Sequence, residues 1–256
     1  MKENNFFHTG EENNMKKYFN VALEFNHSLI RDIVRNSIEK DRKGYVCIVD
    51  ANVLFKAQKD HNYCDIINKS IVNSCDGSSI AMLASLVYKK QMRAWNGPDI
   101  FSYYIEKKHK QLLLGSNNET LDQIKDRLKK KGFDDNHISS LSLPFLSVED
   151  FDYEKISMKI NNIKPDIIWV SLGAPKQEIF MSKLLPYLSK GIMFGIGAAF
   201  NFYTGKIALP NYQIGALKFI WISRILSEPI KQLTRIIPYI MIMPKLYFKE
   251  NKNKNK

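Results

Sequence analysis

Short apolar runs alternate along this chain with amphipathic stretches, and this alternation restricts the fold more than any other feature of the sequence. The amphipathic stretches repeat their apolar residues at helical spacing, as Leu29, Ile33, Val34 and Ile38 do. The apolar runs have the length of strands and are followed by glycine or polar residues; they are Tyr45–Val49, Ser70–Cys75, Gln111–Leu114, Asp166–Ser171 and Ile192–Phe194. Strands that alternate with helices predict a layered α/β domain.

Glycine, asparagine and proline mark where two of the predicted helices begin or end. Asn117 is expected to cap the start of a helix that stops at Gly132. A further helix is predicted from about Pro175 to Leu188. Pro175 suits the first turn of that helix, because its missing N–H has no partner to lose there.

The composition changes after Gly205. Residues 206–250 carry aromatics, arginines and the apolar stretch Ile236–Met243, which contains Pro238 and is followed by Pro244. We interpret this segment as a helical appendage, not as further sheet, that packs on the core or lies on a membrane surface. The predicted organisation is a flexible N-terminus (1–17), an α/β core (18–205), a basic helical appendage (206–250) and a disordered tail (251–256).

Cysteine and histidine usage argues against a metal centre or a disulfide framework. Cys47, Cys64 and Cys75 lack a C-x-x-C spacing and lie in or near apolar runs, which fits a reducing cytoplasm. The five histidines, at positions 8, 27, 61, 109 and 137, show no spacing typical of metal ligands. We also expect neither a secretion signal nor a membrane span, since no apolar segment approaches about 18 residues.

The net charge of +12 at pH 7 is concentrated near the C-terminal end. From Lys206 onward the chain has ten lysines or arginines against Glu228 and Glu250. A basic block of this kind suits nucleic acid, anionic lipid or a diphosphate, and its charge alone does not choose between them.

Polar and small residues follow each predicted strand, where an α/β sheet binds its ligands. These residues are Asp50 and Asn52, Asp76 and Gly77, Gly115 to Asn117, Gly173 to Glu178, and Gly195, Gly197 and Asn201. Small residues allow close approach of a ligand to the backbone, amides bind phosphate, and a carboxylate can act as a base. The set is what a nucleotide-sugar site requires.

Asp76 is the preferred candidate for that base. A hydroxyl acceptor must lose its proton as it attacks an anomeric carbon, and an aspartate at a strand end can accept it. The alternative is a plain turn, because Asp-Gly is a common turn pair. Asp50 has a similar alternative as a strand-end cap.

The remaining strand-end residues also have two interpretations. In the first turn of the helix after Ser171, Gln177 is placed to hydrogen-bond a base or sugar hydroxyl and Lys176 to meet a phosphate, or both belong to a solvated helix start. Gly115 either begins an anion-binding site at a helix N-terminus or belongs to an ordinary helix cap. Neither G-x-G-x-x-G nor a P-loop motif is present, which disfavours a dinucleotide site and a P-loop ATPase.

Five motifs in order resemble the WecG/TagA/CpsF family of glycosyltransferases over roughly residues 18–240. They are Cys75-Asp-Gly77, Asn96-Gly-Pro-Asp99, Val170-Ser-Leu-Gly-Ala-Pro-Lys-Gln-Glu178, Gly195-Ile-Gly-Ala-Ala-Phe-Asn-Phe-Tyr-Thr-Gly205 and Ser227-Glu-Pro229. The G-x-P-K-Q-E segment after a buried strand is the most specific of them. The resemblance implies a Rossmann-like core with a central, mainly parallel sheet between helices, plus a C-terminal helical appendage.

The resemblance also implies roles for single residues. The family's base falls on Asp76, its T-x-N donor motif on Asp50 and Asn52, and its glutamine on Gln177. Aspartate replaces the threonine of that motif, and Asn201 replaces an aspartate that is usual in the glycine-rich segment. The implied donor site further includes Gly115, Gly173, Lys176, Glu178, Gly195 and Gly197. The basic positions expected to meet a diphosphate are Arg93, Arg224, Lys231 and Arg235, because arginine binds two oxygens at once.

The implied reaction is inverting transfer of a hexose or N-acetylhexosamine from a UDP-sugar to an undecaprenyl-diphosphate-linked acceptor, in capsule, exopolysaccharide or teichoic acid synthesis. No metal cofactor is implied, and no convincing D-x-D motif is present. The expected partners are the UDP-sugar, the polyprenyl acceptor, an anionic membrane surface and further copies of the chain, with no nucleic acid. The expected location is the inner face of the cytoplasmic membrane.

Two other functions remain open at this point. A nucleotide-sugar epimerase or dehydrogenase would use a Tyr-x-x-x-Lys pair, for which Tyr103–Lys107 is a candidate. A binding module for nucleic acid or membrane would use the basic tail and show salt-dependent binding that UDP does not affect.

Overall fold

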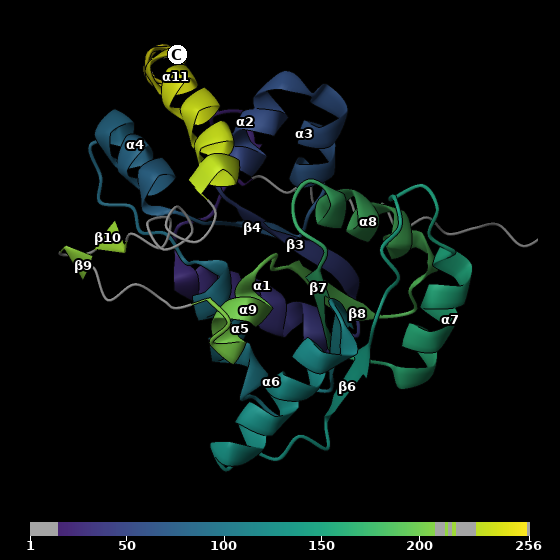
Figure 1. Ribbon diagram of the computed structural model, residues 1–256. Coiled ribbons are helices and arrows are strands. Elements are labelled where there is room, and N and C mark those ends of the chain that lie inside the picture. Colours follow the sequence, from purple (N-terminus) through teal and green to yellow (C-terminus); the bar gives the residue numbers. More distant parts are fainter. Residues whose placement is uncertain (1–14, 208–212, 215–216, 219–228, 255–256) are drawn as a thin grey trace, which may run out of the picture.

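A six-stranded parallel sheet organises the protein in the computed structural model, which describes residues 15–207, 213–214, 217–218 and 229–254 (Figure 1). Its strand order is β4-β3-β8-β7-β5-β6. The strands are β3 (Lys43–Val49), β4 (Val72–Cys75), β5 (Gln111–Gly115), β6 (Ile138–Leu141), β7 (Ile167–Ser171) and β8 (Gly191–Gly195). The expected α/β, Rossmann-like core with a parallel sheet between helices is confirmed.

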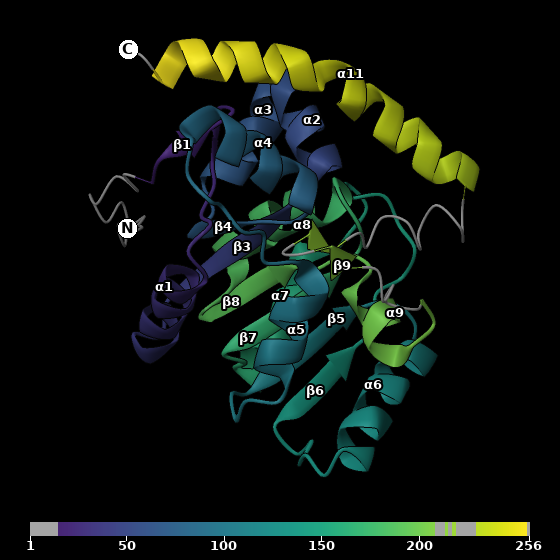
Figure 2. The ribbon, with the colours of Figure 1, turned by 90° about the vertical axis from the view of Figure 1, so that its left-hand side faces the viewer.

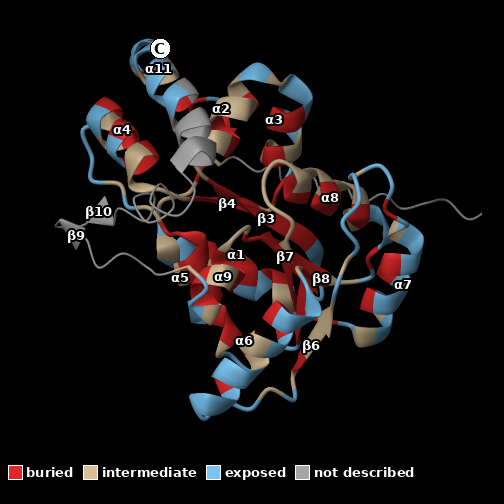
Figure 3. Cartoon of the chain, in the orientation of Figure 1, coloured by how far each residue is buried: buried red, intermediate tan, exposed pale blue. Residues whose placement is uncertain are grey.

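Helices cover both faces of this sheet. One face carries α1 (His27–Glu39), α5 (Gly97–Ile105), α6 (Asn118–Lys130) and α9 (Ala199–Thr204). The other carries α2 (Ala51–Lys59), α3 (His61–Asn68), α4 (Ser78–Tyr88), α7 (Tyr153–Ile163) and α8 (Lys176–Leu184), the last followed by a 3-10 turn, η1 (Leu185–Tyr187). Tyr45 and Val46 of β3 are both buried, on opposite faces of the sheet. Strand β3 is therefore buried on both sides (Figure 3), which explains why its sequence is continuously apolar.

The predicted helix boundaries agree with these elements at α6 and differ at α8. Asn117 caps α6, and its side-chain oxygen accepts a hydrogen bond from the Thr120 N–H (2.9 Å). Helix α8 begins after Pro175, which follows a cis peptide bond and occupies the capping position, not the first turn. The predicted helix to Leu188 therefore consists of a shorter α-helix and a 3-10 turn.

A long C-terminal helix, α11 (Pro229–Lys254), lies against α2 and α4 (Figures 1 and 2). Its buried face contributes Tyr239 and Leu246 to the core. The predicted helical appendage is therefore confirmed for this part, but residues 251–254, predicted as disordered, continue the helix. Two short antiparallel pairs complete the described elements: β1 (Lys17–Tyr18) with β2 (Val21–Ala22), and β9 (Gln213–Ile214) with β10 (Leu217–Lys218). The second pair departs from the expectation of no further sheet after residue 205.

Candidate functional site

The carboxyl ends of the strands bring the predicted site loops to one edge of the sheet. The strand order places the loops of Asp76 (after β4), Asp50 (after β3), Gly195, Gly173 and Gly115 in succession along that edge. Four strand spacings of about 4.8 Å separate the first loop from the last, or roughly 19 Å. The sequence order of these loops is different, so the strand order assembles the candidate site.

Asp76 follows β4 in a turn that two hydrogen bonds fix. Its N–H donates to the Val49 carbonyl (2.8 Å) at the end of β3. The next residue, Gly77, has a φ of +102° and its N–H donates to Oδ1 of the buried Asn96 (3.3 Å). The turn that the Asp-Gly pair predicts is therefore present, and it presents the half-buried Asp76 at the edge where a ligand would bind.

Asp50 and Asn52 lie beside this turn at the start of α2. Asp50 caps the helix, and its Oδ1 accepts a hydrogen bond from the Val53 N–H (2.8 Å). Asn52 lies in the first helical turn and is half-buried. The alternative of a strand-end cap thus holds for Asp50, while both residues stay at the same edge as Asp76.

Gln177 and Glu178 point into the protein, where both side chains are buried. Gln177 Oε1 accepts from the Gly197 N–H (2.9 Å), and its Nε2 donates to Glu178 Oε1 (2.8 Å). Glu178 Oε2 accepts from the Tyr63 hydroxyl of α3 (3.0 Å). The solvated helix start considered for Gln177 is therefore wrong. Glu178 lies behind the glycine loop (residues 195–197) rather than on a surface that a donor would meet.

Burial raises the pKa of Glu178 to about 7, although the hydrogen bonds from Gln177 and Tyr63 favour its ionised form. The neighbouring Asp50 carboxylate adds to the rise. A carboxyl group this deeply buried needs its two donors, because an unsatisfied buried charge is costly.

The glycine loop after β8 packs closely against Met181 and Gln177 of α8. A Cβ on Gly195 would lie 2.8 Å from Met181 Cε and 3.2 Å from Gln177 Nε2, so no larger residue fits without displacement. Gly197 has a φ of +53°. Asn201 lies in α9 and is half-buried, with its carbonyl accepting from the Ile207 N–H (3.1 Å).

A hollow of about 510 Å³ opens at the other half of the edge, between the loops after β5, β6 and β7. Lys176 lines it, donates to the Leu146 carbonyl and lies 5.1 Å from the centroid of the Phe145 ring. Gly115 (φ +93°) and Gly173 (φ +75°) adopt left-handed backbone in the loops beside this hollow. Phe145 is fully exposed at its mouth, as a side chain that stacks on a planar ligand would be.

The predicted basic residues are placed only in part. Arg93 is exposed in the loop that follows α4, two residues before Trp95, whose N–H donates to the Cys75 carbonyl (2.9 Å). Lys231 and Arg235 belong to α11, but their side chains, like the whole of Arg224, lie outside the described residues.

Tyr239 of α11 is a candidate that the sequence patterns did not indicate. It is buried beside Ser79 of α4 and near Asp50, and burial raises its pKa to about 12. Helix α11 therefore covers the two helices that begin at Asp50 and Gly77. An aromatic at helical spacing is ordinarily a core residue, so no sequence signal distinguished it.

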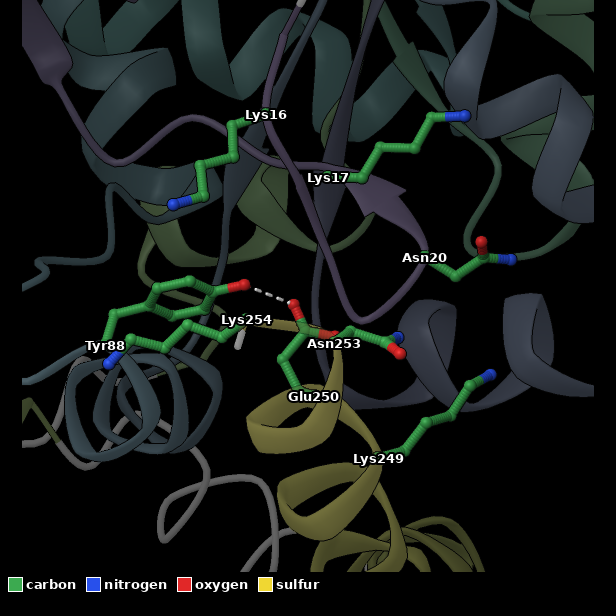
Figure 4. Close-up of a pocket in the computed structure, with 8 residues that line it drawn as sticks. All are labelled: Lys16, Lys17, Asn20, Tyr88, Lys249, Glu250, Asn253 and Lys254. Carbon is green, nitrogen blue, oxygen red and sulfur yellow. Dashed lines mark hydrogen bonds between the residues drawn. The ribbon is translucent and has the colours of Figure 1, made fainter. Parts of the chain in front are cut away.

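A second hollow, of about 340 Å³, lies where α11 ends, next to the β1–β2 hairpin and the C-terminal end of α4 (Figure 4). Tyr88 and Glu250 both line it, and the Tyr88 hydroxyl donates to Glu250 Oε1 (2.7 Å). Lys16 and Lys254 lie 4.3 and 5.5 Å from the centroid of the Tyr88 ring. The basic end of α11 is thus attached to the core at the far end of α4 from Gly77.

Other reactive side chains play no evident part in either hollow. Cys47, Cys64 and Cys75 are buried and free, and burial raises the pKa of the Cys47 and Cys75 thiols. Within the described residues, no three His, Cys, Asp or Glu side chains gather as ligands of a metal ion would.

Comparison with known sequences identifies the family. Residues 21–256 match the family described as glycosyl transferase WecG/TagA/CpsF. The chain belongs to this family. This member of the WecG/TagA/CpsF family is therefore a glycosyltransferase, as the resemblance predicted.

Three relatives of this WecG/TagA/CpsF protein carry the same name. Each is named N-acetylglucosaminyldiphosphoundecaprenol N-acetyl-beta-D-mannosaminyltransferase. The protein of Bacillus subtilis (strain 168) is 22% identical over 241 residues, covering 89% of this chain and 88% of the relative. That of Bacillus spizizenii (strain ATCC 23059 / NRRL B-14472 / W23) is 21% identical, covering 79% and 78%. That of Staphylococcus aureus (strain MW2) is 21% identical, covering 85% and 87%.

Proposed function

We propose that the protein transfers a hexose or N-acetylhexosamine from a UDP-sugar to a sugar linked to undecaprenyl diphosphate. The observation that carries this proposal is the position of Asp76, in a fixed turn at the same sheet edge as the glycine loop. The names of the relatives support the polyprenyl acceptor and an N-acetylmannosaminyl donor group. The product would be an intermediate of cell-surface polysaccharide synthesis.

In the proposed reaction Asp76 acts as general base. An acceptor hydroxyl attacks the anomeric carbon while Asp76 accepts the hydroxyl proton, and the bond between that carbon and the UDP oxygen breaks. A single displacement of this kind inverts the anomeric centre. The negative charge that develops on the diphosphate would be met by Lys176 and Arg93 and by the basic residues of the C-terminal segment, Arg224, Lys231 and Arg235.

The test is release of UDP from a panel of UDP-sugars in the presence of a polyprenyl-diphosphate-N-acetylglucosamine acceptor. We expect one or a few donors to react and Asp76→Asn to lower kcat by about 10² to 10⁴, the usual contribution of a general base. UDP binding should be retained, because the substitution keeps the size of the side chain. Unchanged turnover in Asp76→Asn would refute the assignment of the base.

We also propose that transfer requires no bound metal. The basic residues named above would then provide the positive charge that a divalent cation supplies in other transferases. The expected outcome is the same initial rate of UDP release with and without EDTA after the protein has been dialysed against chelator. Loss of activity with EDTA and recovery with Mg²⁺ or Mn²⁺ would contradict this proposal.

The site of action is proposed to be the inner face of the cytoplasmic membrane, where α11 would contact anionic lipid. No helix among the described residues is long and apolar enough to cross a bilayer. The outer side of α11 nevertheless exposes Ile237, Ile240, Met241 and Phe248, next to the exposed Lys245 and Lys249. Apolar side chains flanked by lysines are typical of a helix that lies in a membrane interface.

A further inference from the structure

Four residues form one continuous chain of hydrogen bonds behind the glycine loop. The Tyr63 hydroxyl donates to Glu178, Gln177 Nε2 donates to the other oxygen of Glu178, and the Gly197 N–H donates to Gln177 Oε1. Gln177 and Glu178 are 3% and 0% exposed and Tyr63 is 2% exposed, so these bonds form away from bulk water. Hydrogen bonds in such surroundings are strong, and breaking one leaves a buried polar group unsatisfied.

The carboxylate of Glu178 fixes which way the amide of Gln177 faces. An amide offers an acceptor oxygen on one side and an NH₂ donor on the other. With Glu178 accepting on the near side, the NH₂ must face it, and the oxygen is left for Gly197. The reversed amide would put two oxygens together at Glu178 and two donors together at Gly197. Glu178 therefore selects the orientation that holds the loop.

Gly197 is held at both of its polar atoms. Gln177 binds its N–H, and the Ser171 hydroxyl at the end of β7 donates to its carbonyl (2.7 Å). The φ of +53° and the close contacts at Gly195 leave this backbone few other conformations. The loop lies near the centre of the sheet edge, because β8 stands between β3, which Asp50 follows, and β7, which ends at Ser171.

We propose that Glu178, supported by Tyr63, is a positioning residue for the transfer reaction. It orients the Gln177 amide, and the amide in turn keeps the Gly195–Gly197 loop in the shape that the sugar donor meets. This inference rests on the proposed function for its effect on catalysis. Its structural part, the hold on Gly197, is independent of any substrate.

The variants separate the contribution of Glu178 to this hydrogen-bond network from that of Tyr63. Glu178→Leu removes both acceptors, Glu178→Gln keeps an oxygen for Gln177 and can donate to the Tyr63 oxygen, and Tyr63→Phe removes one bond to the carboxylate. The matched control is Tyr45→Phe. Tyr45 is also a buried tyrosine of the same cluster, and its hydroxyl donates to the Ile66 carbonyl (2.5 Å), not to the network.

The measurements are amide exchange at Gly197 by NMR, the Kd for UDP, and kcat and KM for the donor. We expect Glu178→Leu to speed exchange at Gly197 at least tenfold and to raise the Kd for UDP and the donor KM by a similar factor. Glu178→Gln should bring all three values, the exchange rate, the Kd and the KM, to within about threefold of the wild type. Tyr63→Phe should exchange at least threefold faster at Gly197 than Tyr45→Phe does.

Each outcome decides the proposal. Equal exchange at Gly197 in Tyr63→Phe and Tyr45→Phe would overturn it, even if Glu178→Leu fails to fold. Faster exchange at Gly197 with an unchanged Kd for UDP and an unchanged KM would also overturn it, because the loop would then not serve the donor. If the wild type releases no UDP from any donor, the proposed function fails, whereas the exchange data still decide whether Glu178 holds the loop.

Discussion

The buried surroundings of the Glu178 carboxyl group favour its neutral, protonated form. Its immediate surroundings are Gln177 and Tyr63 as donors, with Cys47 and the Asp50 carboxylate nearby. Burial raises the pKa of this group from an ordinary value near 4.5 to about 7. The folded chain therefore binds the Glu178 proton more tightly than the unfolded chain does.

This difference predicts how stability depends on pH. Because the folded pKa lies above the unfolded one, the contribution of Glu178 to stability is complete below about pH 4.5 and is lost as the pH rises through about 7. Glu178→Gln cannot titrate, so urea unfolding of both proteins at several pH values isolates the effect. The free energy of unfolding of the wild type should fall relative to the variant by up to about 3 kcal/mol, at about 1.4 kcal/mol per pKa unit. Parallel curves for the two proteins would show that the prediction is wrong.

At the scale of elements, helix α11 has one side that packs on the core and one side that is exposed. Tyr239 and Leu246 face the core, whereas Met241 and Phe248 are 76% and 70% exposed. Both Pro238 and Pro244 lie within the helix, which bends along its length (Figure 2). Pro244 costs the hydrogen bond to the carbonyl of residue 240, and that residue is itself exposed, so water can replace the lost donor.

The exposed side of α11 is predicted to bind anionic vesicles. Phe248→Glu places a charge where an apolar side chain would enter the headgroup region, so we expect a clear loss of co-flotation with phosphatidylglycerol vesicles. Met158→Glu is the control, because Met158 is equally a well-exposed apolar residue (60%) but lies on α7. Equal binding by the two variants would contradict a role for α11. Removing the whole segment from Lys206 is a poorer test, since it would also remove Tyr239 and Leu246 and expose the core surface that they cover.

At the scale of the whole molecule, the sequence predicted the layered sheet because buried parallel strands are continuously apolar. Strand β6 was not predicted, because it is an edge strand in which only Ile138 is buried. The succession of strands along the sheet could not be predicted, since it depends on crossovers between distant segments. The site loops were found for the same reason as the strands, because each follows an apolar run.

What could not be predicted of the site is the direction of its side chains. Polar residues in a first helical turn usually face water, yet Glu178 accepts a hydrogen bond from Tyr63, which lies more than one hundred positions earlier, and Gln177 accepts one from the Gly197 N–H. Tyr239 likewise reaches the start of α4 only because α11 folds back across it. Long-range contacts of this kind leave no local pattern in the chain.

Lys16 and Lys254 lie over the same tyrosine ring, so residues near the two ends of the described chain are close together. We therefore expect that the order of the elements along the chain can be changed while their packing is kept. A circular permutant that joins Lys254 to Lys16 through a few glycine and serine residues, and that begins at Asp134 in the exposed turn after α6, should keep every contact at the carboxyl edge. We expect its melting temperature to lie within a few degrees of the parent's and its UDP affinity to be unchanged. A permutant that melts without cooperativity would show that the linear order of the segments, and not only their packing, is needed to form the sheet.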